Sequence, residues 1–147
     1  MTTDAAHEST EGRLRSAGLK VTAPRLAVLD AFPADPIHLS ADEVYARVAP
    51  ALPSTSLQAV YGVLAALVAS GLLRKIEPAG SAARYEKRIG DNHHHLICRG
   101  CNAIEDVDCV IGEAPCLTPS DTHGFRLQAA DVTFWGLCPS CQAALAE

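Results

Sequence analysis

The chain has 147 residues, of which 48% are hydrophobic and 20% charged, and its formal net charge is −5. This length allows one ordinary domain or two small ones, and the apolar fraction excludes a disordered chain. No apolar run approaches the roughly 20 residues of a membrane-spanning helix. The start "MTTDAAHESTEGR" is polar and acidic, unlike a secretory leader. We therefore expect a cytoplasmic protein without membrane contact, whose six cysteines stay reduced as metal ligands or redox groups.

Charge is divided unevenly along the chain. Residues 1–88 carry 10 Lys and Arg against 9 Asp and Glu, whereas residues 89–147 carry 2 against 8. The near-neutral first part can still gather its bases on one face, and the acidic second part can bind cations. The change falls near "KRIGDN". It predicts one domain at 1–88, another at 92–147, and a hinge at about 87–92.

Residues 12–50 carry the signals of three helices. The first is predicted to end at Gly18, a residue that tolerates the left-handed conformation after a helix. The second is predicted to begin after Thr22 as N-cap, with a proline in its first turn. The third should begin after Ser40, which forms a capping box with Glu43.

The clearest helix lies within residues 53–73. Thr55 and Gln58 predict a second capping box, and Gly71 predicts the helix end. Apolar residues recur at steps of three and four and predict one buried stripe: Leu57, Val60, Leu64, Leu67 and Val68. Two short strands around the turn "PAGS" follow within residues 72–87.

Helices followed by a hairpin are the order of a winged-helix domain, whose recognition helix offers polar residues to the DNA major groove. Here Ser56, Gln58 and Tyr61 lie mostly off the apolar stripe. Several basic residues could contact DNA phosphates: Arg13, Arg15, Lys20, Arg25, Arg74, Lys75, Arg84, Lys87 and Arg88. Of these we expect Arg15, Lys20 and Arg25 to do so. A helical domain without a ligand, with an ordinary basic surface, is the alternative.

Two Cys-x-x-Cys pairs lie in the second part of the chain. Cys98 with Cys101 and Cys138 with Cys141 each present two sulfurs on a tight turn. Together they supply the four thiolates of a structural zinc site, which would join distant parts of this domain. Two disulfides or a redox-active pair remain the alternative.

The stretch "HHHLICRGC", residues 93–101, adds histidines next to the first cysteine pair. In an extended strand, His93 and His95 point to one side and the histidine between them to the other. Glu86 and Asp106 offer oxygen donors nearby in the sequence. Nitrogen and oxygen ligands without sulfur suit iron(II), manganese or zinc, so a second metal site is predicted. An apolar strand that carries histidines without a metal is the alternative.

The pieces "VTAPRLAVL", "HLSADEVY", "SLQAVYGVL", "RYE", "HHHLICRGC" and "GLCPSC" together resemble the ferric uptake regulator family of metal-dependent repressors. The resemblance covers about residues 11–145. It implies an α+β protein, with an N-terminal winged helix-turn-helix domain followed by a small α/β dimerisation domain with a four-cysteine zinc site. It also implies a repressor, not an enzyme, that binds palindromic operator DNA as a homodimer.

The resemblance assigns the structural Zn²⁺ to the same four cysteines. It assigns a regulatory Fe²⁺ or Mn²⁺ at the hinge to five residues of both domains: His38, Glu86, His93, His95 and Asp106. His38 enters only through the resemblance, because no local pattern links it to the histidines of the second domain. An ion held by both domains would set the spacing of two recognition helices, and one spacing matches a palindrome.

"FWGLCPSC" and "SLQAVYGVL" look most like an actinobacterial branch of this family that represses catalase-peroxidase genes. For that branch the resemblance implies a sensor of hydrogen peroxide, in which oxidation of His38 or His93 ends repression. The best-known peroxide sensors carry Asp where this chain has Glu86. An iron- or zinc-responsive repressor of metal uptake genes is therefore the alternative. A zinc enzyme is not expected, because no residue stands out as a general base beside an open zinc site.

Overall fold

The computed structural model describes residues 8–33, 37–87, 93–108, 119–127 and 132–146. The chain divides into two compact units, Met1–Gly90 and Asp91–Glu147. Within the described residues, no helix has the length and apolar character needed to cross a membrane. Cys109 and Cys116, for which the sequence allows either a buried apolar role or a thiol switch, lie outside the described residues.

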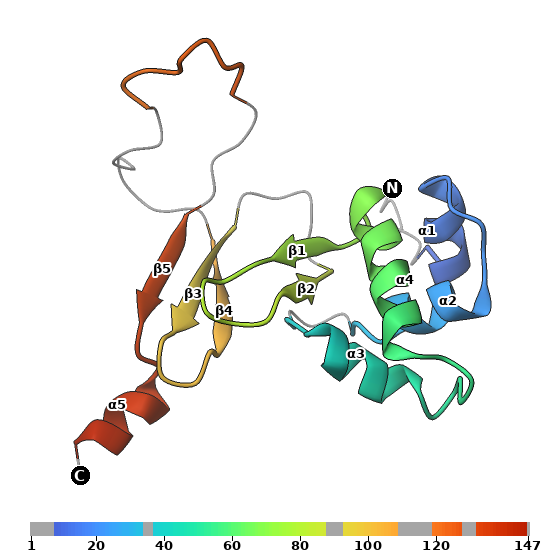
Figure 1. The fold of residues 1–147 in the computed structure, drawn as a ribbon, viewed down its shortest axis with the longest axis horizontal. Coiled ribbons are helices and arrows are strands. Elements are labelled where there is room, and N and C mark those ends of the chain that lie inside the picture. The colour runs from blue at the N-terminus through green and yellow to red at the C-terminus, as the bar shows by residue number, and fades with distance from the viewer. Residues whose placement is uncertain (1–7, 34–36, 88–92, 109–118, 128–131, 147) are drawn as a thin grey trace, which may run out of the picture. The chain divides into compact units, whose positions relative to one another are not determined.

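The first unit contains four helices and a hairpin (Figure 1). The helices are α1 (Thr10–Ser16), α2 (Ala23–Asp30), α3 (Ala41–Val48) and α4 (Leu57–Ala69). Each follows a serine or threonine whose side-chain oxygen accepts a backbone N–H from the helix's first turn; these residues are Ser9, Thr22, Ser40 and Ser56. The capping box predicted between Ser40 and Glu43 is confirmed in both directions, at 3.2 and 2.7 Å.

The start of α4 differs from the prediction by one residue. Thr55 and Gln58 do not form a capping box, because Ser56 is the N-cap and accepts the N–H of Ala59 at 3.1 Å. Two adjacent residues that can both cap leave the choice to the surrounding fold. The predicted helix ends at Gly18 and Gly71 are confirmed, since both have positive φ, at 77° and 79°.

The core of the first unit lies between these helices and the hairpin. The predicted stripe of α4 supplies Val60, Leu64 and Leu67, each at most 1% exposed. Leu57 and Val68 complete the stripe at the edge of the core, where they are partly buried. Fully burying one such aliphatic side chain contributes roughly 2 kcal/mol, so this cluster dominates the stability of the unit.

The hairpin consists of β1 (Arg74–Ile76) and β2 (Arg84–Glu86), with Arg74 opposite Glu86. Strand β2 has a second neighbour. Leu39 and Tyr85 form an isolated antiparallel bridge on the other edge of β2, with backbone hydrogen bonds of 3.0 and 2.8 Å. The segment that leads into α3 is thereby fixed beside the hairpin.

The described residues of the second unit form a three-stranded sheet and a short helix (Figure 1). Its elements are β3 (His94–Cys98), β4 (Ile104–Val107), β5 (Thr133–Gly136) and α5 (Pro139–Leu145). The strand order is β4-β3-β5, with β3 antiparallel to β4 and parallel to β5. The predicted α+β architecture, with helices and a wing followed by a small α/β unit, is confirmed.

Candidate metal centres

The four cysteines of the two pairs meet at one end of the sheet in the second unit. Cys98 ends β3 and Cys101 lies in the turn to β4, whereas Cys138 is the N-cap of α5 and Cys141 lies in its first turn. Their four sulfur atoms lie within 4.8 Å of one another. All four are free thiols, so the disulfide alternative is not realised.

The spacing of the sulfur atoms fits a tetrahedral metal ion. Cys101 Sγ and Cys138 Sγ are 3.7 Å apart. Zinc–sulfur bonds of about 2.3 Å in a tetrahedron place sulfur atoms about 3.8 Å apart. Four sulfurs are the ligand set of a closed structural zinc site.

Backbone N–H groups support a thiolate at Cys98. The N–H groups of Gly100 and Cys138 each lie 3.3 Å from Cys98 Sγ. Hydrogen bonds from the backbone of Cys138 and Cys101 are the main cause that lowers the pKa of Cys98 to about 6. Contacts with the sulfurs of Cys138 and Cys98 raise the pKa of Cys141 to about 12, so the cluster opposes full deprotonation until a cation binds.

The turn between the first two cysteines has little space. A Cβ atom at Gly100 would lie 2.9 Å from Cys141 Sγ, which is closer than such atoms approach. Asn102 has φ 61°, a left-handed conformation that asparagine tolerates better than most residues. The turn therefore needs a residue without a side chain at position 100.

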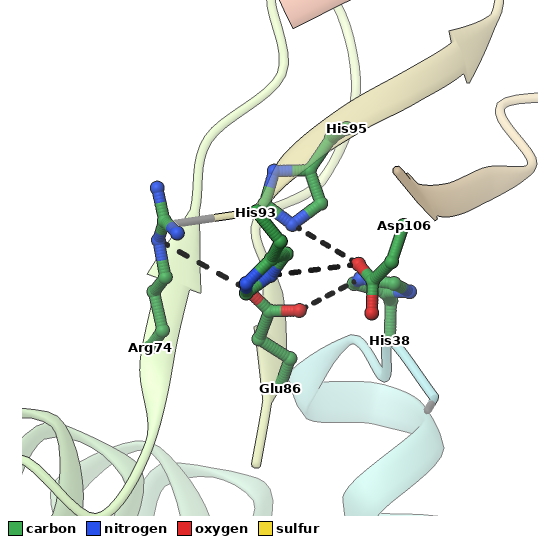
Figure 2. Close-up of polar contacts among 6 residues, drawn as sticks. All are labelled: His38, Arg74, Glu86, His93, His95 and Asp106. Atoms are coloured by element: carbon green, nitrogen blue, oxygen red, sulfur yellow. Dashed lines mark ion pairs between the residues drawn. The ribbon is translucent and has the colours of Figure 1, made fainter. Parts of the chain in front are cut away.

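The first unit holds a buried histidine–carboxylate pair. The bridge between Leu39 and Tyr85 places the next residues, His38 and Glu86, opposite each other. His38 Nε2 lies 2.9 Å from Glu86 Oε2, and the side chains are 6% and 1% exposed. Figure 2 shows this pair together with Arg74, whose Nε lies 3.9 Å from Glu86 Oε1.

The second unit holds a buried group of the same kind. His93 Nε2 and His95 Nε2 lie 3.6 and 3.3 Å from the same oxygen, Asp106 Oδ1 (Figure 2). Their side chains and that of Asp106 are at most 6% exposed. The two imidazole rings are 4.9 Å apart in an edge-to-face arrangement. The two histidines thus lie on one side of β3, as the alternation of an extended strand predicts.

The chemistry of the two groups is the same. Both combine imidazole nitrogen with carboxylate oxygen and contain no sulfur, a ligand set that suits iron(II), manganese(II) or zinc. Burying a carboxylate is unfavourable unless a cation or hydrogen-bond donors compensate it. Each group by itself offers two or three donors, fewer than the about four to six ligands that these metals take in proteins.

The residues expected to read DNA bases lie around the start of α4. Gln58 is exposed, and the side chain of Tyr61 is 48% exposed. Ser56 is exposed as well, but its hydroxyl accepts the N–H of Ala59 and so caps the helix. Gln58 and Tyr61 are therefore the side chains of this set that are available for contact.

The three basic residues singled out for phosphate contacts lie around α1 and α2. Arg15 is exposed and forms a salt bridge with Glu11 at 3.3 Å. Lys20 is exposed in the connection between the two helices. Arg25 is half-buried and donates to the carbonyl of Lys20 at 2.8 Å, so it holds this connection in place.

Known sequences resemble the chain over nearly its whole length. A sequence model of the ferric uptake regulator family matches residues 16–135. The transcriptional regulator FurA of Mycobacterium tuberculosis is 59% identical over 129 residues, which is 88% of this chain and 87% of that protein. The ferric uptake regulation protein 1 of Mycolicibacterium fortuitum is 55% identical over 124 residues, 84% of this chain and 76% of the relative.

Solved structures share the fold. The Helicobacter pylori ferric uptake regulator superposes with a TM-score of 0.72 at 24% identity, covering 97% of both chains, and this likeness shows the fold. The regulator of Francisella tularensis, solved with iron, has a TM-score of 0.68 at 26% identity and covers 85% of this chain and 96% of that one. That of Pseudomonas aeruginosa, solved with manganese, has a TM-score of 0.65 at 26% identity, covering 91% and 99%.

Proposed function

This chain belongs to the ferric uptake regulator family, and from this premise we propose that it is a metal-dependent, peroxide-sensing repressor of transcription. It is a metal-responsive transcriptional regulator. Its relatives are named as transcriptional regulators, which confirms the expectation of a regulator that is not an enzyme. Peroxide sensing, the control of catalase-peroxidase genes and the identity of each metal are the parts that we propose.

Regulators of this family bind operator DNA and act as dimers. We assign DNA binding to the first unit, with Gln58 and Tyr61 of α4 toward the bases, and dimerisation to the second unit. Leu96, Phe134 and Trp135 of that unit are 43%, 40% and 39% exposed. Apolar and aromatic side chains that remain this exposed are typical of surfaces that a partner covers. A regulator of transcription acts where the chromosome lies, which in a bacterium is the cytoplasm.

The cluster of Cys98, Cys101, Cys138 and Cys141 would hold a structural zinc ion. The match between the sulfur spacing and tetrahedral zinc supports this assignment. The ion would join the turn after β3 to the start of α5. Among the described residues of α5 none is buried, so this helix depends on the cysteines for its attachment.

A single regulatory ion would take ligands from both units. His38 and Glu86 would come from the first unit, and His93, His95 and Asp106 from the second. This proposal is supported by the two buried imidazole–carboxylate groups, one in the sequence before residues 88–92 and one after them. Each group is incomplete alone, whereas together they offer five nitrogen and oxygen donors to iron(II) or manganese(II). An ion so held would fix the angle between the units and favour the DNA-binding arrangement.

Hydrogen peroxide would end repression through the histidine ligands. When bound, iron(II) would supply the one-electron redox chemistry that activates the peroxide, which is itself the net two-electron oxidant of the ring. The imidazole of His38 or His93 gains one oxygen atom, and the other oxygen of the peroxide leaves as water. An oxidised ring binds the metal less well. The two units then lose the ion that they share, and the affinity for operator DNA falls.

Mass spectrometry of the iron-loaded protein tests this proposal. Intact mass and peptide masses are compared before and after one equivalent of hydrogen peroxide, with the manganese-loaded protein as the matched control. The proposal expects a gain of one oxygen on a peptide that contains His38 or His93, with iron only. Unchanged masses for both peptides in the iron-loaded protein, under conditions that oxidise free methionine, would contradict it.

A regulator that responds to iron or zinc supply is the second candidate. Glu86 favours it, because the best-known peroxide sensors of the family carry Asp at this ligand. The Mycolicibacterium fortuitum relative, named as a ferric uptake regulation protein, also favours it. In this case the iron-loaded and manganese-loaded proteins would keep the same operator affinity after peroxide treatment.

A further inference from the structure

Glu86 is the middle residue of a row that crosses three segments of the first unit. On one side, the register of the hairpin places Arg74 of β1 directly opposite Glu86 of β2. On the other side, the bridge between Leu39 and Tyr85 places His38 next to Glu86. In Figure 2 Arg74 and His38 accordingly approach the carboxylate of Glu86 from opposite sides.

Each of these neighbours approaches a different oxygen of Glu86. Oε1 lies 3.9 Å from Arg74 Nε, and Oε2 lies 2.9 Å from His38 Nε2. The carboxylate is 1% exposed, whereas the side chain of Arg74 is 30% exposed. Arg74 therefore reaches inward from the partly exposed face of the hairpin and brings a permanent positive charge to a buried acid.

We propose that Arg74 is a positioning residue of the regulatory metal site, and this inference rests on the proposed function. The positive charge of its guanidinium attracts Oε1 across 3.9 Å and so favours an orientation of the carboxylate in which Oε2 faces His38 and a cation bound there. Glu86 then serves as a ligand through one oxygen in a fixed orientation. Partners that orient a metal ligand typically account for about 10–100-fold in metal affinity.

The sequence alone predicts a different role for Arg74, as one of the basic residues that could contact DNA phosphates.

Lys75, the next residue in β1, allows a comparison with Arg74. Successive side chains of a strand point to opposite faces, and Lys75 Nζ contacts Glu77 at 2.8 Å on the exposed side. The hydrogen bond with Glu77 is the main cause that raises the pKa of Lys75. Lys75 is therefore a matched control, one residue from Arg74 and equally cationic.

The experiment measures the affinity of the full-length protein for Mn²⁺ by titration calorimetry. The variants are Arg74→Met, Arg74→Lys, Lys75→Met and Glu86→Gln. Arg74→Met should weaken binding by about 10–100-fold because Glu86 loses its orientation. Arg74→Lys should recover part of this loss, since it keeps the charge without the planar group, and Lys75→Met should bind as the wild type does.

The electron paramagnetic resonance spectrum of bound Mn²⁺ at saturation separates positioning from a general loss of stability. A purely structural Arg74 would alter the unfolding temperature and leave this spectrum unchanged, whereas a positioning residue changes the spectrum in Arg74→Met and not in Lys75→Met. Wild-type affinity and spectrum in Arg74→Met, or tighter binding, would overturn the inference. If Glu86→Gln also binds Mn²⁺ like the wild type, the proposed site itself fails; if Glu86→Gln alone is impaired, only the role of Arg74 fails.

Discussion

Leu39 and Tyr85 exchange backbone hydrogen bonds of 3.0 and 2.8 Å across the outer edge of β2. This relationship places His38 opposite Glu86, the two residues of the first unit that we propose as ligands of the regulatory ion. The side chains of Leu39 and Tyr85 are both 4% exposed and belong to the core. The proposed ligands of the first unit are thus positioned by the packing of the same core that holds the helices.

Truncation of Leu39 should reduce the stability of the first unit. We expect Leu39→Ala to lower the free energy of unfolding by about 2–5 kcal/mol, since it removes buried methyl groups and leaves a cavity. Urea unfolding followed by far-ultraviolet circular dichroism measures this loss. Leu145→Ala is the control, because Leu145 is 74% exposed. An equal decrease in the free energy of unfolding for the two variants would contradict the role of Leu39 in the core.

A side chain at Gly100 should weaken the cysteine cluster. The Cβ atom of Gly100→Ala would lie 2.9 Å from Cys141 Sγ, so the turn or the helix must shift. We expect lower zinc content per chain after dialysis against a chelator, measured by elemental analysis. Gly136→Ala is the matched control in the same unit, because a Cβ atom there would have no atom within 4 Å. Full zinc retention in Gly100→Ala would show that the turn is less restricted than the geometry indicates.

Removal of zinc should affect the second unit before the first. The chain has one tryptophan, and Trp135 lies in β5 with the guanidinium of Arg99 5.6 Å from its ring. Because zinc binding and folding are coupled in such sites, chelation should change the tryptophan fluorescence. The helical circular dichroism should largely remain, because four of the five described helices, α1 to α4, belong to the first unit. A loss of both signals at the same chelator concentration would argue against independent units.

A charge on the exposed apolar strand should oppose dimerisation. Phe134→Asp places a carboxylate where an aromatic side chain is 40% exposed. Burying an unpaired charge at an interface is costly, so this variant should sediment as a monomer at concentrations where the wild type is a dimer. Thr122→Asp adds the same charge at another exposed residue and should leave sedimentation unchanged. A dimeric Phe134→Asp would place the interface elsewhere.

Local sequence signals predict most of the fold. Thr22 and Ser40 cap their helices as predicted, because the signal lies within one helical turn. At α4, Thr55 and Ser56 are both able to cap, and only the packed structure selects Ser56. The meeting of the cysteines is predicted from their spacing, because two Cys-x-x-Cys turns can together supply the four sulfurs of one zinc site.

Local sequence patterns do not predict the contacts among the residues proposed for the regulatory site. His38 meets Glu86 through a bridge between residues far apart in the chain, which no periodicity reveals, and only the family resemblance adds His38 to the proposed site. The role of Arg74 depends on the register of the hairpin, which is set by the turn and the core. A basic residue in the hairpin of a winged-helix domain predicts a contact with DNA. The residue opposite Arg74 in this hairpin is, however, the acid Glu86.

A calorimetric titration of Mn²⁺ into the zinc-loaded protein and two variants, Glu86→Gln in the first unit and Asp106→Asn in the second, tests most directly whether one ion is held by both units. If it is, the wild type binds one regulatory ion per chain, and both variants bind that same ion more weakly. Two ions per chain, each weakened by only one of the substitutions, would contradict a single ion held by both units.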